Sequence, residues 1–118
     1  MLFRILSIAS IAFGALAPLS AEAGSRCGIA SWYGPGFHGS RTASGERFNS
    51  HGLTAAHRNL PFGTRLKVLN PSNGRSVIIR VNDDGPHIAG RMLDLSQGAF
   101  ARIASTGQGI AKVCYSKV

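Results

Sequence analysis

The sequence predicts an all-β domain with one short helix, folded as a small closed barrel. Six short segments with strand-like composition are separated by glycine-rich loops, and only one stretch has the residue spacing of a helix. Closing six strands into a barrel removes the exposed edges that an open sheet of this size would leave. We therefore expect a six-stranded barrel with the helix packed against it.

The first 23 residues have the pattern of a secretory signal peptide. Arg4 supplies a positive charge, Ile5–Ala17 is apolar, and Ala21–Ala23 offers the small residues of a cleavage site. The apolar run is shorter than the ~20 residues that span a bilayer. We predict cleavage after Ala23, export to the periplasm or beyond, and no stable membrane anchor. Since an arginine rather than a small residue precedes Cys27, lipidation is not expected.

Residues 24–118 are predicted to form one domain, because the segment is too short for two. The net charge is +8, and removing the leader, with its one arginine and one glutamate, leaves that value unchanged. A surface this basic attracts polyanions. Export argues against nucleic acid and leaves anionic wall polymers and membrane surfaces as candidate partners. No long apolar stripe is present, which favours a monomer.

Cys27 and Cys114 are the only cysteines and lie near the two ends of the domain. An exported protein meets an oxidising compartment, so we predict a disulfide between them; two unpaired buried thiols are the alternative. A loop of this length would stabilise the fold by roughly 4 to 5 kcal/mol in the chain-entropy model.

A first strand is expected over Cys27–Tyr33, and the loop that follows is long for so small a domain. Gly34, Gly36 and Gly39 interrupt the strand pattern, and the loop extends to Gly45. Long ordered loops in compact domains tend to be functional. This one carries the side chains of Tyr33, Phe37, His38, Arg41, Thr42, Ser44 and Glu46.

Three further strands are predicted in the middle of the chain. Leu53–Ala56 is a short strand, and Arg58–Gly63 is a turn. Arg65–Leu69 and Ser76–Val81 flank Asn73-Gly74, and an Asn-Gly pair between two such runs is a strong hairpin signal. These two runs should therefore pair with each other as antiparallel strands.

The C-terminal part of the chain predicts a strand, a helix and a last strand. Met92–Leu95 is the fifth strand, and Ser96 is suited to cap a helix from Gln97 to about Ala104. The apolar residues of that helix recur at helical spacing and should face the core. Ile110–Tyr115 is the sixth strand, and it would bring the two cysteines together if the first and last strands are neighbours.

Residues 24–118 contain four acids: Glu46, Asp83, Asp84 and Asp94. Asp83 follows a β-branched run and precedes Gly85-Pro86, so its carboxylate should be held at a rigid strand end. Neighbouring strand residues point to opposite faces, so only one of Asp83 and Asp84 can face a site. We assign Asp84 to an Asx turn, and that same turn is the alternative for Asp83. Asp94 is interpreted as a structural carboxylate, bonded to backbone or to an arginine.

No metal or cofactor is expected. The four histidines, His38, His51, His57 and His87, have no recognised ligand spacing. There is no Gly-x-Ser-x-Gly nucleophile motif, and the cysteines are better explained by the disulfide.

Seven short motifs follow one another in the order seen in the rare lipoprotein A family. The resemblance covers about Gly28 to Ile103 and implies a six-stranded double-psi β-barrel, the fold shared with expansin first domains and barwin-like proteins. The motifs are Ala30–Gly34, Thr42–Glu46, Leu53–His57, Leu60–Thr64, Asn73–Arg75, Val81–Asp83 with Gly85-Pro86, and Asp94–Ser96.

The resemblance implies an endolytic lytic transglycosylase that cuts peptidoglycan glycan strands stripped of stem peptides. In that reaction a carboxyl group protonates the glycosidic oxygen and then accepts the proton of the C6 hydroxyl, which closes on C1. No water attacks, so a single acid can suffice, whereas hydrolysis usually needs two.

The family pattern implies Glu46, His57 and Asp83 as the catalytic positions. We assign the acid/base role to Asp83, with Glu46 and His57 as its hydrogen-bonding and electrostatic neighbours. Substrate-binding residues are expected among Tyr33, Trp32, Thr42 and Asn82. For Trp32 a place in the core is an equal alternative.

Two positions depart from the common family pattern: Asn49 stands where an aspartate is usual, and Asp84 where an arginine is usual. Losing an acid at Asn49 weakens a hydrolase mechanism more than a transglycosylase one, and a negative charge at Asp84 would raise the pKa of Asp83. The competing function is a non-catalytic, expansin-like or barwin-like module that grips wall glycan in a basic groove.

Overall fold

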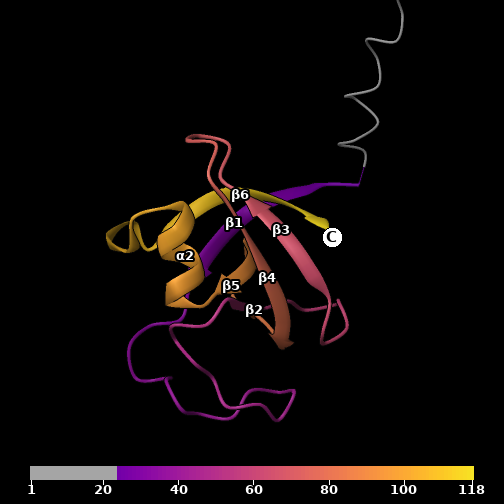
Figure 1. The fold of residues 1–118 in the computed structure, drawn as a ribbon, viewed down its shortest axis with the longest axis vertical. Helices are drawn as coiled ribbons and strands as arrows, with labels where there is room; N and C mark the ends of the chain where they lie inside the picture. Colours follow the sequence, from indigo (N-terminus) through magenta and orange to yellow (C-terminus); the bar gives the residue numbers. More distant parts are fainter. Residues whose placement is uncertain (1–23) are drawn as a thin grey trace, which may run out of the picture.

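The computed structural model describes residues 24–118, so the predicted signal peptide lies outside the described residues. Six strands, one α-helix and one short 3-10 helix make up this part of the chain (Figure 1). In chain order they are β1 (Arg26–Trp32), β2 (Thr54–Ala56), β3 (Arg65–Leu69), β4 (Ser76–Asp83), β5 (Arg91–Leu95), α2 (Gln97–Ile103), η2 (Thr106–Gln108) and β6 (Ile110–Lys117).

The strands close into a barrel in the order β1-β5-β2-β4-β3-β6, which confirms the predicted architecture. Strands β1 and β5 are parallel, as are β2 and β4, and the other neighbours are antiparallel. The expected hairpin is present as β3 and β4, with Gly74 at a φ of 77° in its turn. The short strand β2 lies between β4 and β5 and pairs with both of them.

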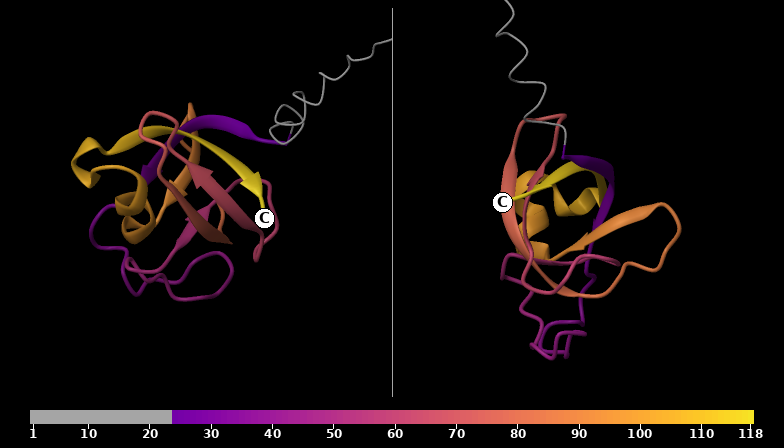
Figure 2. Two further views of the ribbon diagram at one scale, coloured as in Figure 1. Left: turned by 45° about the horizontal axis from the view of Figure 1, so that its top comes forward. Right: turned by 90° about the vertical axis from the view of Figure 1, so that its right-hand side faces the viewer.

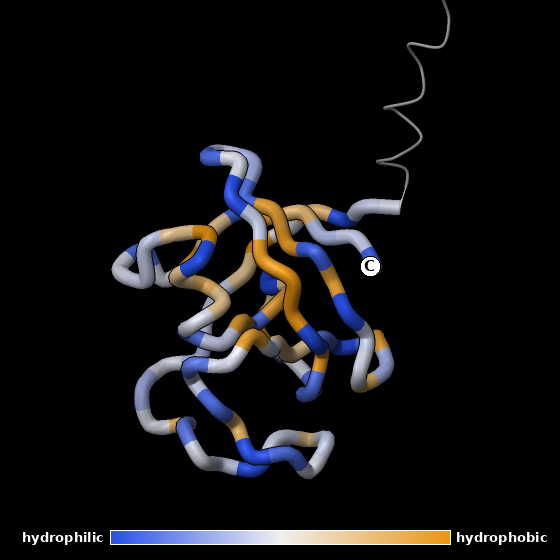
Figure 3. The backbone as a smooth tube through the Cα atoms, in the orientation of Figure 1, coloured by the Kyte–Doolittle hydropathy of each residue, from blue (hydrophilic) through white to orange (hydrophobic). Residues whose placement is uncertain are grey.

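Alternating side chains fill the barrel. In β4 the buried apolar residues are Val77, Ile79 and Val81, and exposed residues stand between them. Figure 3 shows hydrophobic residues along β3 and β4, whereas the loop between β1 and β2 is largely hydrophilic. Helix α2 closes the core by burying Ala99, Phe100 and Ile103, as the helical spacing predicts.

The predicted disulfide is confirmed. Strands β1 and β6 are antiparallel neighbours, and Cys27 lies directly opposite Cys114 in their register. The two residues form the Cys27–Cys114 bond, and the structure describes no free cysteine in residues 24–118. The bond therefore ties the first described strand to the last.

Helix α2 is capped as predicted and is tied to the end of the long loop. The Ser96 hydroxyl accepts a hydrogen bond from the Ala99 N–H at 3.2 Å and donates one to the Gly52 carbonyl at 2.6 Å. The Gly98 N–H also donates to the Ser50 carbonyl at 2.8 Å. The first turn of the helix thus fixes residues 50–52, where the loop enters β2.

The loop between β1 and β2 projects from one end of the barrel (Figure 2). It folds back on itself through a bridge between Arg41 and Arg47. Tyr33, Phe48 and Ala56 form a second apolar cluster outside the barrel core, and this cluster anchors the loop to strand β2. The loop is therefore held to the barrel at Ala56.

Candidate functional site

Strand β4 carries Asp83 to the base of this loop. The ladder between β2 and β4 has an irregularity between Ala55 and Ala56, so that Asp83 becomes the partner of Ala56. Strand β4 ends at Asp83, two residues before Gly85, whose φ of 136° few other residues adopt. Asp83 is thus the last residue of β4, two residues beyond the predicted end of this strand.

Three donors hold the Asp83 carboxylate. The Tyr33 hydroxyl donates to Oδ2 at 2.5 Å, while the backbone N–H groups of Ala43 and Asp84 donate to Oδ1 at 2.8 and 2.9 Å. Ala43 belongs to the long loop, so this contact links the loop to the end of β4. The carboxylate is fixed in position and remains partly exposed.

Tyr33 is an oriented hydrogen-bond donor in a largely apolar setting. Its ring stacks on Phe48 with centroids 4.3 Å apart and meets Phe37 edge-on at 5.8 Å. The residue is 9% exposed. Burial first, and then the hydrogen bond and the negative charge of Asp83, raise the pKa of the phenol far above its ordinary value. Tyr33 therefore stays protonated and donates to Asp83.

Glu46 lies in the same region but is paired with Arg80. The guanidinium of Arg80 donates to both carboxylate oxygens at 2.8 Å, and Asn82 Nδ2 approaches Oε1 at 3.3 Å. The bonds from Arg80 are the main reason that the pKa of Glu46 is lowered. Its side chain is 40% exposed. Glu46 is thus an ionised group that organises its neighbours and is unsuited to donate a proton at neutral pH.

Thr42 and Asn82, predicted to bind substrate, are both buried and hold the loop together. The Thr42 hydroxyl donates to the Glu46 carbonyl at 2.8 Å, and its backbone N–H bonds the same oxygen. The Asn82 carbonyl accepts from the Ser44 N–H. Asn82 is only 2% exposed. The structure therefore places both residues beneath the surface, as supports of the loop carrying Glu46.

The ring of His57 points away from the Asp83 carboxylate. Its Nδ1 accepts hydrogen bonds from the backbone N–H groups of Asn59 and Leu60, at 2.9 and 3.1 Å, and its Nε2 bonds the Tyr115 hydroxyl at 2.7 Å. With Nδ1 as acceptor, Nε2 carries the proton and donates it to Tyr115. Burial, followed by the charges of Arg58 and Arg26, lowers the pKa of His57.

Only the backbone of His57 touches the site. Its N–H donates to the Asp83 carbonyl at 3.1 Å and so holds the end of β4 beside β2. His57 lines a pocket together with Arg26, Arg58, Asn59, Met92 and Tyr115. The sequence motif thus brings His57 next to Asp83 along the backbone, but not side chain to side chain.

Trp32 packs toward the helix. Its indole N–H donates to the Thr106 carbonyl at 3.0 Å, and its ring lies 6.4 Å from that of Phe100. Of the two places considered for this residue, the structure shows the one against the core.

Two groups near the site were not expected there. Arg80 is an exposed position in the alternation of β4. Regular alternation would put Arg80 and Asp83 on opposite faces, but the irregularity in the ladder between β2 and β4 shifts the register beyond Val81. Asp94, interpreted as structural, accepts a hydrogen bond from the Ser31 hydroxyl at 3.3 Å rather than from backbone or an arginine. Its place between Leu93 and Leu95, both buried, puts its side chain on the outer face of the barrel wall.

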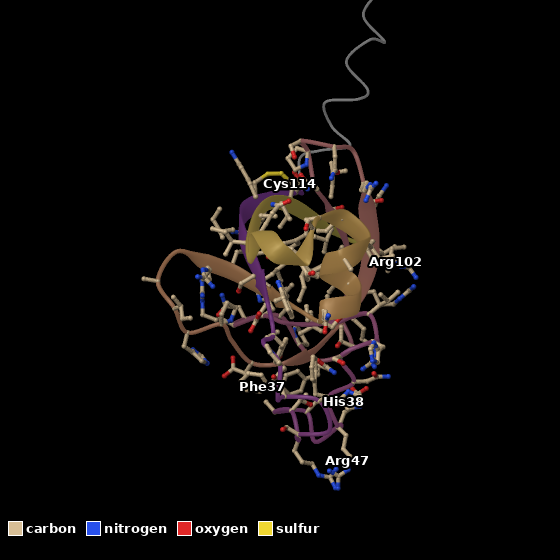
Figure 4. All side chains as sticks on the ribbon, turned by 90° about the vertical axis from the view of Figure 1, so that its left-hand side faces the viewer. Phe37, His38, Arg47, Arg102 and Cys114 are labelled. Atoms are coloured by element: carbon tan, nitrogen blue, oxygen red, sulfur yellow. A yellow bond between two sulfur atoms is a disulfide. The ribbon has the colours of Figure 1, made fainter. Side chains whose placement is uncertain are left out.

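The two departures from the family pattern have local partners. The Asn49 side chain accepts a hydrogen bond from the His51 N–H at 2.9 Å and shapes the loop turn there. The Asp84 carboxylate is exposed and lies 3.5 Å from His87. Figure 4 shows Phe37, His38 and Arg47 of the loop gathered at one end of the molecule, far from Cys114.

Within residues 24–118 no group of three or more acidic, histidine or cysteine side chains is arranged to hold a metal ion. Over the same residues, no helix has the length and hydropathy needed to cross a bilayer.

The fold is that of the double-psi β-barrels. The Streptomyces papain inhibitor superposes with a TM-score of 0.64 at 23% sequence identity, over 80% of this chain and 94% of that one. A mutant Clavibacter michiganensis expansin, solved in complex with cellohexaose, also gives 0.64 at 22% identity, over 80% of this chain and 50% of that one. At these identities the likeness shows the fold alone.

Sequence relatives define the family more narrowly. Residues 25–115 match the family model described as lytic transglycolase. The chain is 63% identical over 86 residues to a probable endolytic peptidoglycan transglycosylase RlpA of Synechocystis, and 55% identical over 86 residues to the RlpA transglycosylase of Campylobacter jejuni. Each match covers 73% of this chain, but only 27% and 31% of those longer proteins. The chain belongs to the RlpA family of lytic transglycosylases, as its motifs predict.

Proposed function

We propose that this protein acts outside the cytoplasm as an endolytic lytic transglycosylase that cuts the glycan strands of peptidoglycan, preferring strands stripped of stem peptides. Family membership supports the reaction class, because the relatives are named for it. The observation that carries the proposal is the Asp83 carboxylate, fixed by three donors at a strand end and still partly exposed.

The proposed reaction needs no water as a reactant. A proton reaches the glycosidic oxygen as its bond to C1 of N-acetylmuramic acid breaks, and the C6 oxygen of the same sugar bonds to C1. The C6 hydroxyl proton passes to a carboxylate, so the protons balance, and the product ends in 1,6-anhydromuramic acid. In this proposal Asp83 is the acid/base that exchanges protons with the reacting sugar.

The neighbours of Asp83 have supporting roles. Tyr33 orients the carboxylate through the 2.5 Å hydrogen bond to Oδ2. Glu46, through Arg80 and Asn82, fixes the loop that supplies the Ala43 N–H. His57 acts through its backbone bond to the Asp83 carbonyl. Thr42 and Asn82 support the substrate surface from below, and Trp32 from the core side.

Purified protein and peptide-free glycan strands test the proposal by mass spectrometry of the products. We expect new 1,6-anhydromuramic ends with the wild type. Asp83→Asn should lose at least about 100-fold in rate, the lower end of what a positioned acid or base contributes. New reducing ends instead would show hydrolysis. Tight binding without new ends would establish the non-catalytic wall-binding module.

A further inference from the structure

Two acids lie in one row across the outer face of the barrel wall. Ala56 of β2 is the register partner of Asp83 on one side and of Asp94 on the other, and Ser31 of β1 follows Asp94. Facing residues on neighbouring strands point to the same side of a sheet. With strands about 4.8 Å apart, the backbones of Asp83 and Asp94 are separated by roughly 10 Å. Their side chains can therefore approach a single bound sugar linkage together.

Tyr33 connects the two acids. Its ring packs in the same cluster as Ala56, the small residue between them, and its hydroxyl donates to Asp83. The negative charges of Asp83 and, to a smaller extent, Asp94 both raise the pKa of Tyr33. The site is thus organised around two acids and one phenol, although the sequence motif singles out Asp83.

The surroundings of the two acids differ. Asp83 accepts hydrogen bonds from a phenol and two backbone N–H groups, which suits an ionised acceptor. For Asp94 the bond found is that from Ser31. Burial is the main cause that raises the pKa of Asp94, and the charge of Asp83 adds to it. The Ser31 hydrogen bond and the Arg91 charge act in the opposite direction.

We propose that Asp94 is a second catalytic carboxyl group, which donates the proton to the glycosidic oxygen, while Asp83 receives the proton of the C6 hydroxyl. This inference rests on the proposed function and narrows the role of Asp83 to that of the base. Pairs of acids whose surroundings differ in this way commonly divide the acid and base roles.

The two transfers balance. The C1–oxygen bond to the leaving sugar breaks and takes the Asp94 proton, so Asp94 becomes a carboxylate. The C6 oxygen bonds to C1 and gives its proton to Asp83, which becomes a neutral acid. Both side chains are partly exposed, so exchange with solvent returns the proton to Asp94 and restores the starting state.

A leaving group that needs no proton separates the two roles. On natural glycan strands, Asp94→Asn should be slowed by at least about 100-fold. On a GlcNAc-MurNAc disaccharide with 4-nitrophenol at the reducing end, nitrophenolate leaves unprotonated, and the same variant should fall within about 10-fold of the wild type. Asp83→Asn should stay slow on both substrates, because the C6 proton must still be removed. Lys112→Gln, which removes one exposed charge from β6, a strand paired with β1 and β3, is the control and should retain wild-type rates on both.

The pH profile gives an independent reading. The charged and polar groups facing Asp94 are Asp83 from β4, Arg91 from β5, Ser31 from β1 and Tyr33 beyond it. The alkaline limb of kcat/KM on natural glycan should report Asp94 losing its proton. Ser31→Ala removes a hydrogen bond that favours the ionised form, so it should move that limb to higher pH. The Ser31→Ala variant also tests the role of Asp94 if the Asp94→Asn variant fails to fold.

The outcomes separate this inference from the proposed function. Absence of anhydro ends with the wild type would overturn the function itself. An active wild type with equally active Asp94→Asn would overturn only the role of Asp94. An Asp94→Asn variant that is equally slow on glycan and on the aryl glycoside, or a Ser31→Ala profile that does not move, would also overturn it.

Discussion

The Tyr33 side chain packs through its ring and forms a hydrogen bond through its hydroxyl. Its ring belongs to the cluster with Phe48 and Ala56, and its hydroxyl bonds Asp83. The resemblance to the family predicts that this tyrosine binds the sugar substrate. In the structure it is only 9% exposed, and its polar atom is directed at the carboxylate. Its main effect should therefore be on the rate and not on substrate affinity.

Tyr33→Phe keeps the ring and removes the hydroxyl. A hydrogen bond to a charged group contributes about 1.5 to 3 kcal/mol, so kcat should fall roughly 10- to 100-fold while KM changes little. Steady-state kinetics on glycan strands measure this. Tyr115→Phe makes the same change at a hydroxyl that bonds His57, and it should reduce thermal stability with a much smaller effect on kcat. Equal losses of kcat in both variants would contradict the assignment.

Asp94 should also influence stability in a direction unusual for an aspartate. Its pKa in the folded protein is raised, mainly by burial, so the folded state holds this proton more tightly than the unfolded state does. The stabilisation that Asp94 contributes by binding this proton is fully present below its ordinary pKa of about 3.9. It is lost as the pH rises through the raised pKa of the folded state.

Asp94→Asn removes this pH-dependent cost and keeps an oxygen that can accept from Ser31. The melting temperature of Asp94→Asn minus that of the wild type should be larger at pH 7.5 than at pH 3.5. Circular dichroism measures both melting temperatures. The exposed Asp84→Asn serves as control. A difference between Asp94→Asn and wild type that is the same at both pH values would contradict the raised pKa.

At the level of single residues, sequence reasoning located Asp83 but not its partners. A β-branched run that ends in Gly-Pro identifies a strand end from local pattern alone. The pairing of β2 with both β4 and β5 is non-local, and it alone places Asp94 in the same row as Asp83. The alternation of β2 indicates that His57 and Ala56 point to opposite faces. The family motif, which rests on residue type, instead predicts that the His57 side chain lies beside Asp83.

At the level of elements, the long loop depends on helix α2. Gly98 lies where the helix meets residues 51 and 52, and a Cβ built on it would stand 2.8 Å from the His51 carbonyl oxygen. This distance is too short for a real contact with a backbone atom, so the loop or the helix would have to move. The helix thus determines where the loop enters β2.

Gly98→Ala tests this dependence. Alanine in a helix is normally favoured over glycine by about 1 kcal/mol, but here the collision should reverse the sign and lower the free energy of unfolding. Chemical denaturation measures it. Gly107→Ala is the matched control, because its Cβ would meet only Ser105 Oγ at 3.6 Å and should be nearly neutral. A stabilised Gly98→Ala variant would show that the contact is looser than described.

The elements themselves were largely predictable. The bounds of β3 agree with the sequence pattern, and those of α2 agree except at its last residue, because an Asn-Gly turn and a serine cap are local signals. Strand β4 extends two residues beyond its predicted end, through Asn82 and Asp83, because pairing with β2 overrides the low strand propensity of both residues. The short helix η2 was missed for lack of a strong capping signal.

At the level of the whole molecule, the disulfide spans 87 residues and closes nearly the entire domain into one loop. Reduction, or replacement of both cysteines by serine, should lower the free energy of unfolding by roughly 4 to 5 kcal/mol. Urea denaturation with and without reductant measures the loss, and intact mass under denaturing conditions should show no free thiol before reduction. An unchanged unfolding midpoint would mean that the closed loop does not restrict the unfolded chain.

The architecture follows from the strand count, whereas the connection order does not. Six short strands with glycine-rich turns favour a barrel in any order. The parallel pairing of β1 with β5 and of β2 with β4 depends on contacts between residues far apart in the sequence. Only the resemblance to the family motifs predicts it. That order brings β4, β2 and β5 together, and the proposed role of Asp83 and Asp94 depends on it.

The pairing of β1 with β6 has a consequence for how such a domain can be combined with others. Arg26 and Tyr115 are register partners, so both ends of the described chain leave from one side of the barrel, away from the loop between β1 and β2 (Figure 1). Further sequence could be attached at either end, or the whole domain inserted into another protein, without covering the face that carries Asp83 and Asp94. The matching segment forms under a third of the Synechocystis and Campylobacter relatives, in keeping with a transferable cassette.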